Sequence, residues 1–408
     1  MRILLSKYRI TFLTLLAAGL ITAIAADRKD PKVYSPGQKE FYLDEKQMAF
    51  IRPGLKVEIQ KAEITGDTVR ATFRLKDDKG EALDREGIAT PGVVSTSFVL
   101  SRIKRGERQY TAYTTATVTS TITRVTAVQP ARDATGVYEK LAEGEYRYTF
   151  GTKLPADFDK AVTHSVGVYA SRNLTEFGLG TYVDNQVYNF VPDGSRVTVV
   201  RDIVRTATCN SRCHDPLSFH GGARRKVELC VLCHQPQNMD PDTGNSVNFP
   251  VLIHKIHMGA RLPSVQAGGT YRIIGAGNRV FDYSDNVFPA DVRNCQVCHD
   301  PSAGAAQSDA WLNANPAACG ACHDNVNFQT GANHGLGGVQ TSDTGCPVCH
   351  APDTGREFDV SIKGAHLAPE KSSRLAGVNF EILSVDGTSP GSNPTVTFKV
   401  TDNKGNLL

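Results

Sequence analysis

All ten cysteines of this chain lie between residues 209 and 349, where they form five pairs that are each followed at once by a histidine. Numbered in chain order, sites 1 to 5 are Cys209, Cys213 and His214; Cys230, Cys233 and His234; Cys295, Cys298 and His299; Cys319, Cys322 and His323; and Cys346, Cys349 and His350. Four of the five are strict Cys-x-x-Cys-His, the attachment signature of a c-type haem. The two thiols add to the two vinyl groups of one porphyrin, and the adjacent imidazole reaches the iron as its proximal ligand. The pattern therefore predicts five covalently bound haems.

Two other kinds of site use the Cys-x-x-Cys spacing. A structural zinc site combines two such pairs or adds distant histidines, and a redox-active pair of cysteines forms a disulfide. Neither requires a histidine directly after the second cysteine, whereas all five pairs have one. Zinc and disulfides remain as alternatives, but haem attachment is the interpretation that explains the histidines.

Five further histidines lie in the same region, one for each site: His220, His254, His257, His334 and His366. A second imidazole makes a haem iron six-coordinate, which leaves no open position for a substrate and suits electron transfer. We therefore predict that these five are the distal ligands, although the sequence alone does not assign them to individual sites. The eleventh histidine, His164, lies in a strand-like stretch far upstream and is interpreted as a surface or packing residue.

These ligands separate two classes of function. An electron conduit needs only closely spaced haems and no bond-making chemistry. A periplasmic multihaem reductase of a small nitrogen or sulfur oxyanion needs one five-coordinate haem, often signalled by a lysine in place of the motif histidine. Since all five motifs end in histidine, we favour the conduit and single out no catalytic residue. The reductase stays as the alternative, and a high-spin ferric signal or binding of nitrite would distinguish it.

The first 26 residues carry three basic residues, then an apolar run at 10–24, and end in small residues. This pattern predicts a secretory signal peptide, with an uncleaved membrane anchor as the alternative. Export fits the haems, because c-type haem is attached outside the cytoplasm. No cysteine lies near the cleavage site, so no lipobox anchor is expected. The formal net charge of the chain is +3, and these three basic residues account for all of it. No basic patch with interleaved aromatics indicates nucleic acid as a partner.

Residues 55–200 consist of short stretches rich in β-branched and aromatic side chains, separated by Gly, Asp, Asn and Pro. The expected strands include 55–64, 69–75, 93–103, 109–118, 146–150, 164–170 and 186–190. This number of short strands predicts a β-sandwich or Greek-key barrel large enough to bury its own core. The stretch contains no recognisable catalytic constellation, so we expect a scaffold, spacer or docking surface.

Residues 201–370 lose the strand pattern and are rich in Gly, Pro, Asn and Asp. Porphyrins would supply the apolar core here, with only short helices around the motifs. One helix is expected over 249–258, with Pro250 near its start and His254 and His257 on one face. The run 240–245 is interpreted as a turn; calcium is the alternative, although the full EF-hand spacing is missing.

The run 209–234, which includes Asp215-Pro-Leu-Ser-Phe-His-Gly-Gly-Ala-Arg-Arg225, resembles the first haem pair of the OmcA/MtrC family of outer-surface decahaem cytochromes. Similar stretches at 253–259, 287–295 and 364–366 extend the resemblance over nearly all of 40–408. The resemblance implies alternating β and pentahaem domains, with the motif histidines proximal and the five further histidines distal. It implies that the haems pass respiratory electrons from one to the next. The expected location is the outer-membrane surface, outside the cell or in the periplasm. The implied partners are other multihaem cytochromes or an outer-membrane porin–cytochrome complex, and the implied acceptors are ferric minerals or flavins.

The end of the chain repeats part of the β region. The Phe, Asp, Lys and Gly of 73–80 recur at identical spacing in 398–405. We therefore expect a second β domain to begin in 371–408 and to be cut off after about two strands, which cannot form a domain alone. The chain would then be a fragment of a longer protein. It departs from the family in having five sites instead of ten, in lacking a lipobox cysteine, and in the extra Arg212 of site 1, which must bulge for both thiols to reach one porphyrin.

Together these patterns predict a mixed fold. Its parts are a signal peptide (1–26), a lead-in arm (27–54), an all-β Greek-key barrel or sandwich (55–200), a loop-rich, mostly helical or irregular pentahaem c-type cytochrome domain (201–370) and the first strands of a second β domain (371–408).

Overall fold

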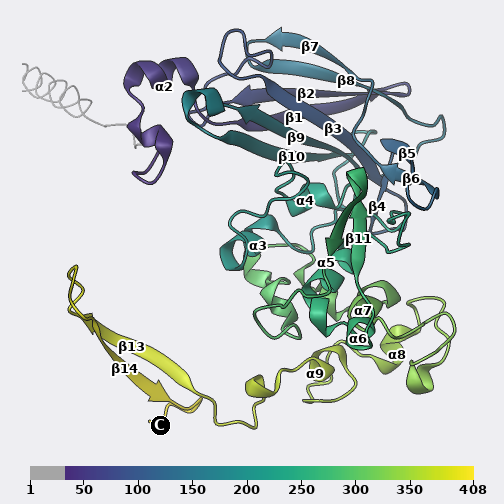
Figure 1. Ribbon diagram of the computed structural model, residues 1–408. Helices are drawn as coiled ribbons and strands as arrows, with labels where there is room; N and C mark the ends of the chain where they lie inside the picture. The colour runs from purple at the N-terminus through teal and green to yellow at the C-terminus, as the bar shows by residue number, and fades with distance from the viewer. Residues whose placement is uncertain (1–32) are drawn as a thin grey trace, which may run out of the picture.

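The computed structural model describes residues 33–408, in which a β domain lies against a region of short helices and loops (Figure 1). That second region, residues 201–370, carries all five cysteine–histidine motifs and is called the motif region below; a two-stranded hairpin follows it. The fold class expected from the sequence is confirmed. The expected signal peptide at 1–26 lies outside the described residues. Within 33–408, no helix is both long and apolar enough to cross a membrane.

The β domain consists of two antiparallel four-stranded sheets. The first sheet has the strand order β1 (Lys56–Thr65), β2 (Thr68–Lys76), β8 (Glu145–Lys153), β7 (Val137–Ala142). The second has the order β10 (Thr181–Phe190), β9 (His164–Asn173), β3 (Val94–Ile103), β4 (Tyr110–Ala112). The sheets meet where β1 passes beside β10, and there the backbone N–H of Val57 donates to the carboxylate of Asp184 over 2.9 Å.

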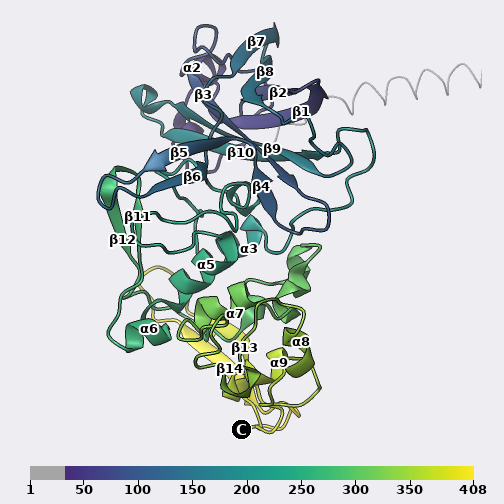
Figure 2. The same cartoon turned by 90° about the vertical axis from the view of Figure 1, so that its right-hand side faces the viewer.

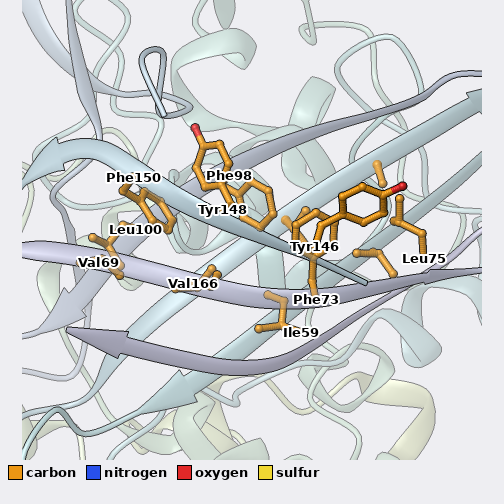
Figure 3. Packing of buried hydrophobic residues seen from close by; sticks show 14 of the residues in the cluster. Ile59, Val69, Phe73, Leu75, Phe98, Leu100, Tyr146, Tyr148, Phe150 and Val166 are labelled. Atoms are coloured by element: carbon orange, nitrogen blue, oxygen red, sulfur yellow. The ribbon is translucent and has the colours of Figure 1, made fainter. Parts of the chain in front are cut away.

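The core lies between the two sheets (Figure 3). Along β2 every second residue is buried, including Val69, Phe73 and Leu75. From the second sheet, the ring of Phe98 stacks on Tyr148 of the first, with centroids 4.3 Å apart. This period-two burial is the pattern by which the sequence revealed these strands.

The expected strand at 109–118 is divided in the structure. It becomes β4 and β5 (Thr115–Thr119), because the hydroxyl of Thr114 turns inward and accepts the backbone N–H of Leu100 over 3.0 Å. β5 pairs with β6 (Thr126–Pro130), which the sequence pattern did not indicate. All of β5 is exposed, so this hairpin carries no core-directed periodicity.

The stretch expected to be a lead-in arm contains a helix, α2 (Glu45–Ile51), which follows a single turn at Lys39–Tyr42. Its end is held by Arg172 of β9, whose side chain is fully buried. The guanidinium donates to the carbonyls of Ile51 at 2.7 Å, Pro91 at 2.9 Å and Gly54 at 3.1 Å. Because a buried charge is tolerated only when it is hydrogen-bonded, Arg172 fixes this helix to the second sheet.

The motif region contains only short helices, as expected. The longest, α5 (Phe249–Met258), has the bounds expected from the sequence, with Pro250 in its first turn. The others are α3 (Thr206–Arg212), α4 (Val227–Cys230), α6 (Pro263–Gln266), α7 (Pro316–Cys322), α8 (Cys346–Cys349) and α9 (Ile362–Ala365). A small hairpin, β11 (Arg272–Gly275) and β12 (Arg279–Asp282), was not expected. It is tied to the turn at 240–245, where the carboxylate of Asp240 accepts the N–H of Ile274 over 2.8 Å.

The C-terminal hairpin repeats the first hairpin of the β domain. Its strands are β13 (Asn379–Asp386) and β14 (Thr395–Thr401). The pairing register shifts directly after Ile382–Phe398, as the register of β1 and β2 shifts after Ile59–Phe73. The two hairpins therefore share a bulge at the same place as well as a sequence pattern.

The turn after this hairpin is also repeated. The carboxylate of Asp402 accepts two backbone N–H groups of the following turn, as Asp77 does in the β domain. The surroundings differ, however. Phe73 is fully buried, whereas its counterpart Phe398 is 54% exposed.

Candidate haem-binding sites

The structure brings the ten histidines of the motif region together in five pairs, each of which joins one motif histidine to one of the five further histidines. The ring centroids are 6.4 Å apart for His214 and His257, 5.8 Å for His234 and His220, 6.4 Å for His299 and His254, 6.2 Å for His323 and His366, and 6.4 Å for His350 and His334. An iron between two imidazoles separates their centroids by about 6 Å, because each metal–nitrogen bond is about 2 Å long and the nitrogen lies about 1 Å from its ring centre. All five spacings fit a haem iron held by two histidines.

The orientation of the rings also suits metal binding. In five of them Nδ1 lies within hydrogen-bond distance of a backbone carbonyl: 2.8 Å for His234 and Val247, 2.9 Å for His257 and Ile253, 2.9 Å for His334 and Gly338, 3.1 Å for His350 and Val360, and 2.7 Å for His366 and Ile362. A carbonyl at Nδ1 holds the proton there and leaves Nε2 as the ligand. Sites 1, 2, 4 and 5 each contain at least one ring fixed in this way.

Burial favours the neutral form of several of these side chains. Burial, and after it the charge of Arg224, lowers the pKa of His220 to about 4. Burial, and after it the neighbouring imidazoles, lowers the pKa of His254 to about 4. Neutral imidazole is the form that binds a metal. Burial likewise raises the pKa of Cys230 to about 12, so this group is a thiol at neutral pH.

One backbone hydrogen bond is common to all five motifs. At sites 2 to 5 the histidine N–H donates to the carbonyl of the first cysteine over 2.9 Å. Site 1 has one more residue, yet the N–H of His214 still reaches the carbonyl of Cys209 at 3.0 Å. The extra residue widens the turn, and the side chain of Arg212 leaves it to form an ion pair with Asp300. Site 1 therefore keeps the backbone hydrogen bond between its first cysteine and its histidine.

Buried polar atoms of the motif region fit a ligand with carboxylates. All ten cysteines are unpaired. Thr208 Oγ1, His254 Nδ1 and Tyr271 Oη are buried and have no hydrogen-bond partner among residues 33–408. Such groups are rare in folded proteins unless a ligand or water satisfies them. The two propionates of a haem are acceptors that these donors could satisfy.

Ion pairs show that sites 1, 3 and 4 are neighbours. Arg212 of site 1 pairs with Asp300, the residue after His299 of site 3. Lys255, which follows His254 on α5, pairs over 2.6 Å with Asp324, the residue after His323 of site 4. Helix α5 joins the same sites, because it carries a histidine paired with site 1 and another paired with site 3.

Sites 5 and 2 lie at the two ends. The backbone N–H of Ile362, in the helix before His366 of site 4, donates over 2.9 Å to the carbonyl of Ala351, the residue after His350 of site 5. The hydroxyl of Thr206, in the helix that carries Cys209 of site 1, donates over 2.7 Å to Glu228, in the helix that carries Cys230 of site 2. The order in space is therefore 2-1-3-4-5. Figure 2 shows α3, α5, α7 and α8 following one another away from the β domain in agreement with this order.

Site 2 is built directly onto the second sheet of the β domain. Leu229 and Leu232, which flank Cys230, are buried in one cluster with Val99 of β3. They lie over Gly167 of β9, where a Cβ atom would approach a methyl group of each leucine to 2.7 Å. Gly167 is thus required by the close approach of the motif to the sheet.

Replacing Gly167 by valine should lower the free energy of unfolding by about 1–3 kcal/mol, the usual cost of adding atoms to a filled core. The midpoint of urea unfolding measures this loss. Gly180 is the matched control, because no atom lies within 4 Å of the position where its Cβ would be. Equal midpoints for Gly167→Val and Gly180→Val would contradict the described packing.

The remaining histidine, His164, belongs to the β domain. Its side chain is buried, with Nε2 3.0 Å from Tyr113 Oη and Nδ1 3.0 Å from the carbonyl of Val162. Both ring nitrogens have partners, which confirms a packing role.

Comparisons with known proteins place these features in context. Residues 201–363 match the family model described as outer membrane cytochrome MtrC/MtrF-like, domains II/IV. The chain is similar to the crystal structure of the outer membrane decahaem cytochrome OmcA, with a TM-score of 0.62 and 23% identity over 87% of this chain. It is similar to MtrC from Shewanella baltica OS185, with a TM-score of 0.56 and 20% identity over 87% of this chain. The chain spans 54% and 51% of the lengths of these two proteins. No curated protein matches it in sequence.

Proposed function

We propose that the chain is a member of the OmcA/MtrC family and that it carries electrons along five c-type haems, since residues 201–363 match the family model and the fold is that of OmcA and MtrC. One observation carries the proposal: every motif histidine has one partner imidazole, at centroid distances from 5.8 to 6.4 Å. With both axial positions filled, each iron would transfer electrons and bind no substrate. The alternative of an oxyanion reductase is not favoured for the same reason.

The pairs assign a role to each ligand. In this proposal the two cysteines of a motif hold the porphyrin and the motif histidine is the proximal ligand. The distal ligands are His257 at site 1, His220 at site 2, His254 at site 3, His366 at site 4 and His334 at site 5. The haems would supply the redox chemistry, while the chain holds the imidazoles in pairs at fixed spacing. Electrons would pass along the order 2-1-3-4-5.

The setting follows from the family. The matched model describes outer membrane cytochromes. We propose that this chain is exported to the outer-membrane surface and exchanges electrons with other multihaem cytochromes or a porin–cytochrome complex. Ferric minerals or flavins are the proposed acceptors.

The hairpin of β13 and β14 is proposed to begin a second β domain in 371–408. It repeats the bulge and the capped turn of β1 and β2. In the first domain these strands are covered by the opposite sheet, whereas Phe380, Ile382 and Phe398 of the second are exposed. Apolar side chains in such a row need further strands to cover them.

The intact mass of the native protein, with a haem-stained gel, tests these proposals together. We expect five haems in the segment described here, and four after replacement of Cys209 and Cys213 by alanine. Replacement of Cys346 and Cys349 is the matched control and should also remove one haem. Four haems in the native segment, unchanged by loss of Cys209 and Cys213, would show that site 1 is not loaded. A longer native protein would support the second β domain, and a mass without haem would refute the proposed function.

A further inference from the structure

The distal histidine of site 2 lies in a strained turn. His220 has a positive φ of 51° and is followed by two glycines that also have positive φ. The turn is closed by a pair of backbone hydrogen bonds between Phe219 and Arg224, of 3.0 and 3.2 Å. A residue other than glycine keeps such a conformation only when its surroundings hold it in place. The contacts that hold this turn therefore decide where the imidazole of His220 lies.

Those contacts come from the β domain. Asn185 of β10 is fully buried, and its amide donates to the carbonyl of Ala223 over 3.0 Å and accepts the N–H of Arg225 over 2.7 Å. Tyr169, its cross-strand partner on β9, lies under the guanidinium of Arg224 at 4.1 Å from the ring centroid. Directly paired residues on neighbouring strands point to the same face of the sheet. One face of the second sheet thus holds the turn at two points.

The same sheet holds the proximal side of site 2. The hydroxyl of Ser101 on β3 donates to the carbonyl of Leu232 over 2.9 Å, and Gln235 accepts the N–H of Ala112 on β4 over 2.8 Å. These contacts fix the backbone on both sides of His234. The distal histidines of the other four sites lie on α5, directly after α9, and in the loop that precedes α8. At site 2, both segments that carry the paired imidazoles are hydrogen-bonded to the β domain.

We infer that the β domain helps to form site 2. Its Asn185 is a positioning residue that keeps the imidazole of His220 where it can bind the iron. This rests on the haem ligation proposed above. The sheet does not change the chemistry of the iron. It sets the distance between the two imidazoles that bind the iron. Loosening the turn from the sheet removes the distal ligand from one haem and leaves the other four haems six-coordinate.

The test replaces Asn185 by leucine, which has the same branched arrangement of four side-chain heavy atoms and neither hydrogen-bonding group of the amide. In the full chain with its haems, we expect a high-spin ferric signal from one haem in electron paramagnetic resonance, and carbon monoxide binding to one haem after reduction. His220→Gly should give the same signal. Tyr182→Phe on the same strand is the control and should leave all haems low-spin, because the hydroxyl of Tyr182 bonds Glu40 on the opposite side.

The outcomes separate the inference from the function. If His220→Gly gives the signal and Asn185→Leu does not, Asn185 does not position the ligand. If neither variant gives it while the native protein has five low-spin haems, the assignment of His220 itself is wrong. If Asn185→Leu unfolds the β domain, Arg224→Gln removes the contact with Tyr169, together with a charge near His220, and should give a smaller fraction of the same signal. A fully low-spin Arg224→Gln protein would then overturn the inference.

Discussion

Replacing Cys295 and Cys298 by alanine is expected to stop electrons from passing between site 5 and site 2, although the haems at both ends remain. Site 3 lies between site 1 and site 4, since Arg212 of site 1 pairs with Asp300 beside His299, and Lys255 beside His254 pairs with Asp324 of site 4. Removal of this haem leaves a gap in the middle of the order 2-1-3-4-5. Because electron transfer slows steeply with distance, the rate across the gap should fall to background.

The measurement needs a donor at one end and a distinct haem at the other. A photosensitiser on Leu336→Cys, an exposed position beside His334, injects electrons at site 5. His220→Met gives the haem of site 2 a methionine ligand and a different spectrum. Transient reduction of that haem should be seen with site 3 intact and lost without it. A sensitiser on Phe219→Cys, next to site 2, is the control and should reduce it in both proteins. Undiminished transfer from site 5 would show that sites 1 and 4 are in direct contact.

Replacing Lys255 by methionine is expected to lower the free energy of unfolding by about 3–5 kcal/mol, because a buried ion pair is broken and one charge is left without its partner. Lys255 Nζ lies 2.6 Å from Asp324 Oδ2, and the side chains are only 14% and 6% exposed. The pair ties α5 to the residue after His323 of site 4. The matched control is Lys61→Met, since Lys61 pairs with Glu63 on the surface, where such pairs contribute at most about 1 kcal/mol.

The effect of Lys255→Met should depend on pH. Burial alone would raise the pKa of Asp324, but hydrogen bonds from Lys255 and Ser264 outweigh burial and hold it below its usual value. A carboxyl group with a lowered pKa stabilises the fold above its unfolded pKa, and this stabilisation is lost as the pH falls through the folded value. The difference between the native protein and the variant should therefore be full at pH 7 and shrink below about pH 4, the ordinary range of an aspartate. Urea unfolding at both pH values measures it, and a constant difference would rule out this role of Asp324.

Much of the site was visible in the sequence because its chemistry requires fixed local spacing. In the proposed haem sites, the two cysteines and the proximal histidine hold one porphyrin from one short turn, so they are close together in the chain. The helix that carries His254 and His257 was also predicted with correct bounds, since Pro250 marks its start. Which histidine serves which site was not predictable. His254 and His257 are three residues apart, yet the first pairs with site 3 and the second with site 1, because the loops that return to α5 decide the pairing.

The contribution of the β domain to site 2 left little trace in the sequence. Asn185 is a polar residue at a buried position of β10, and the strand was expected to begin only at 186. An asparagine at a core-facing position in the strand would have been the available signal. Gly167 is similar, because its role depends on leucines more than sixty residues further along the chain. Sequence periodicity reports which face of a strand is buried and does not report what covers that face.

In the proposed arrangement the histidine pairing also sets how much of the chain must have emerged on export before each site has both imidazoles. Site 2 has both once His234 has emerged. Site 1 begins earlier in the chain but waits for His257, and site 3 waits for His299. Site 4 is last, since its partner His366 follows all five motifs. The β domain precedes every motif in the chain. All strands of the second sheet have therefore emerged before site 2, the first site to have both imidazoles.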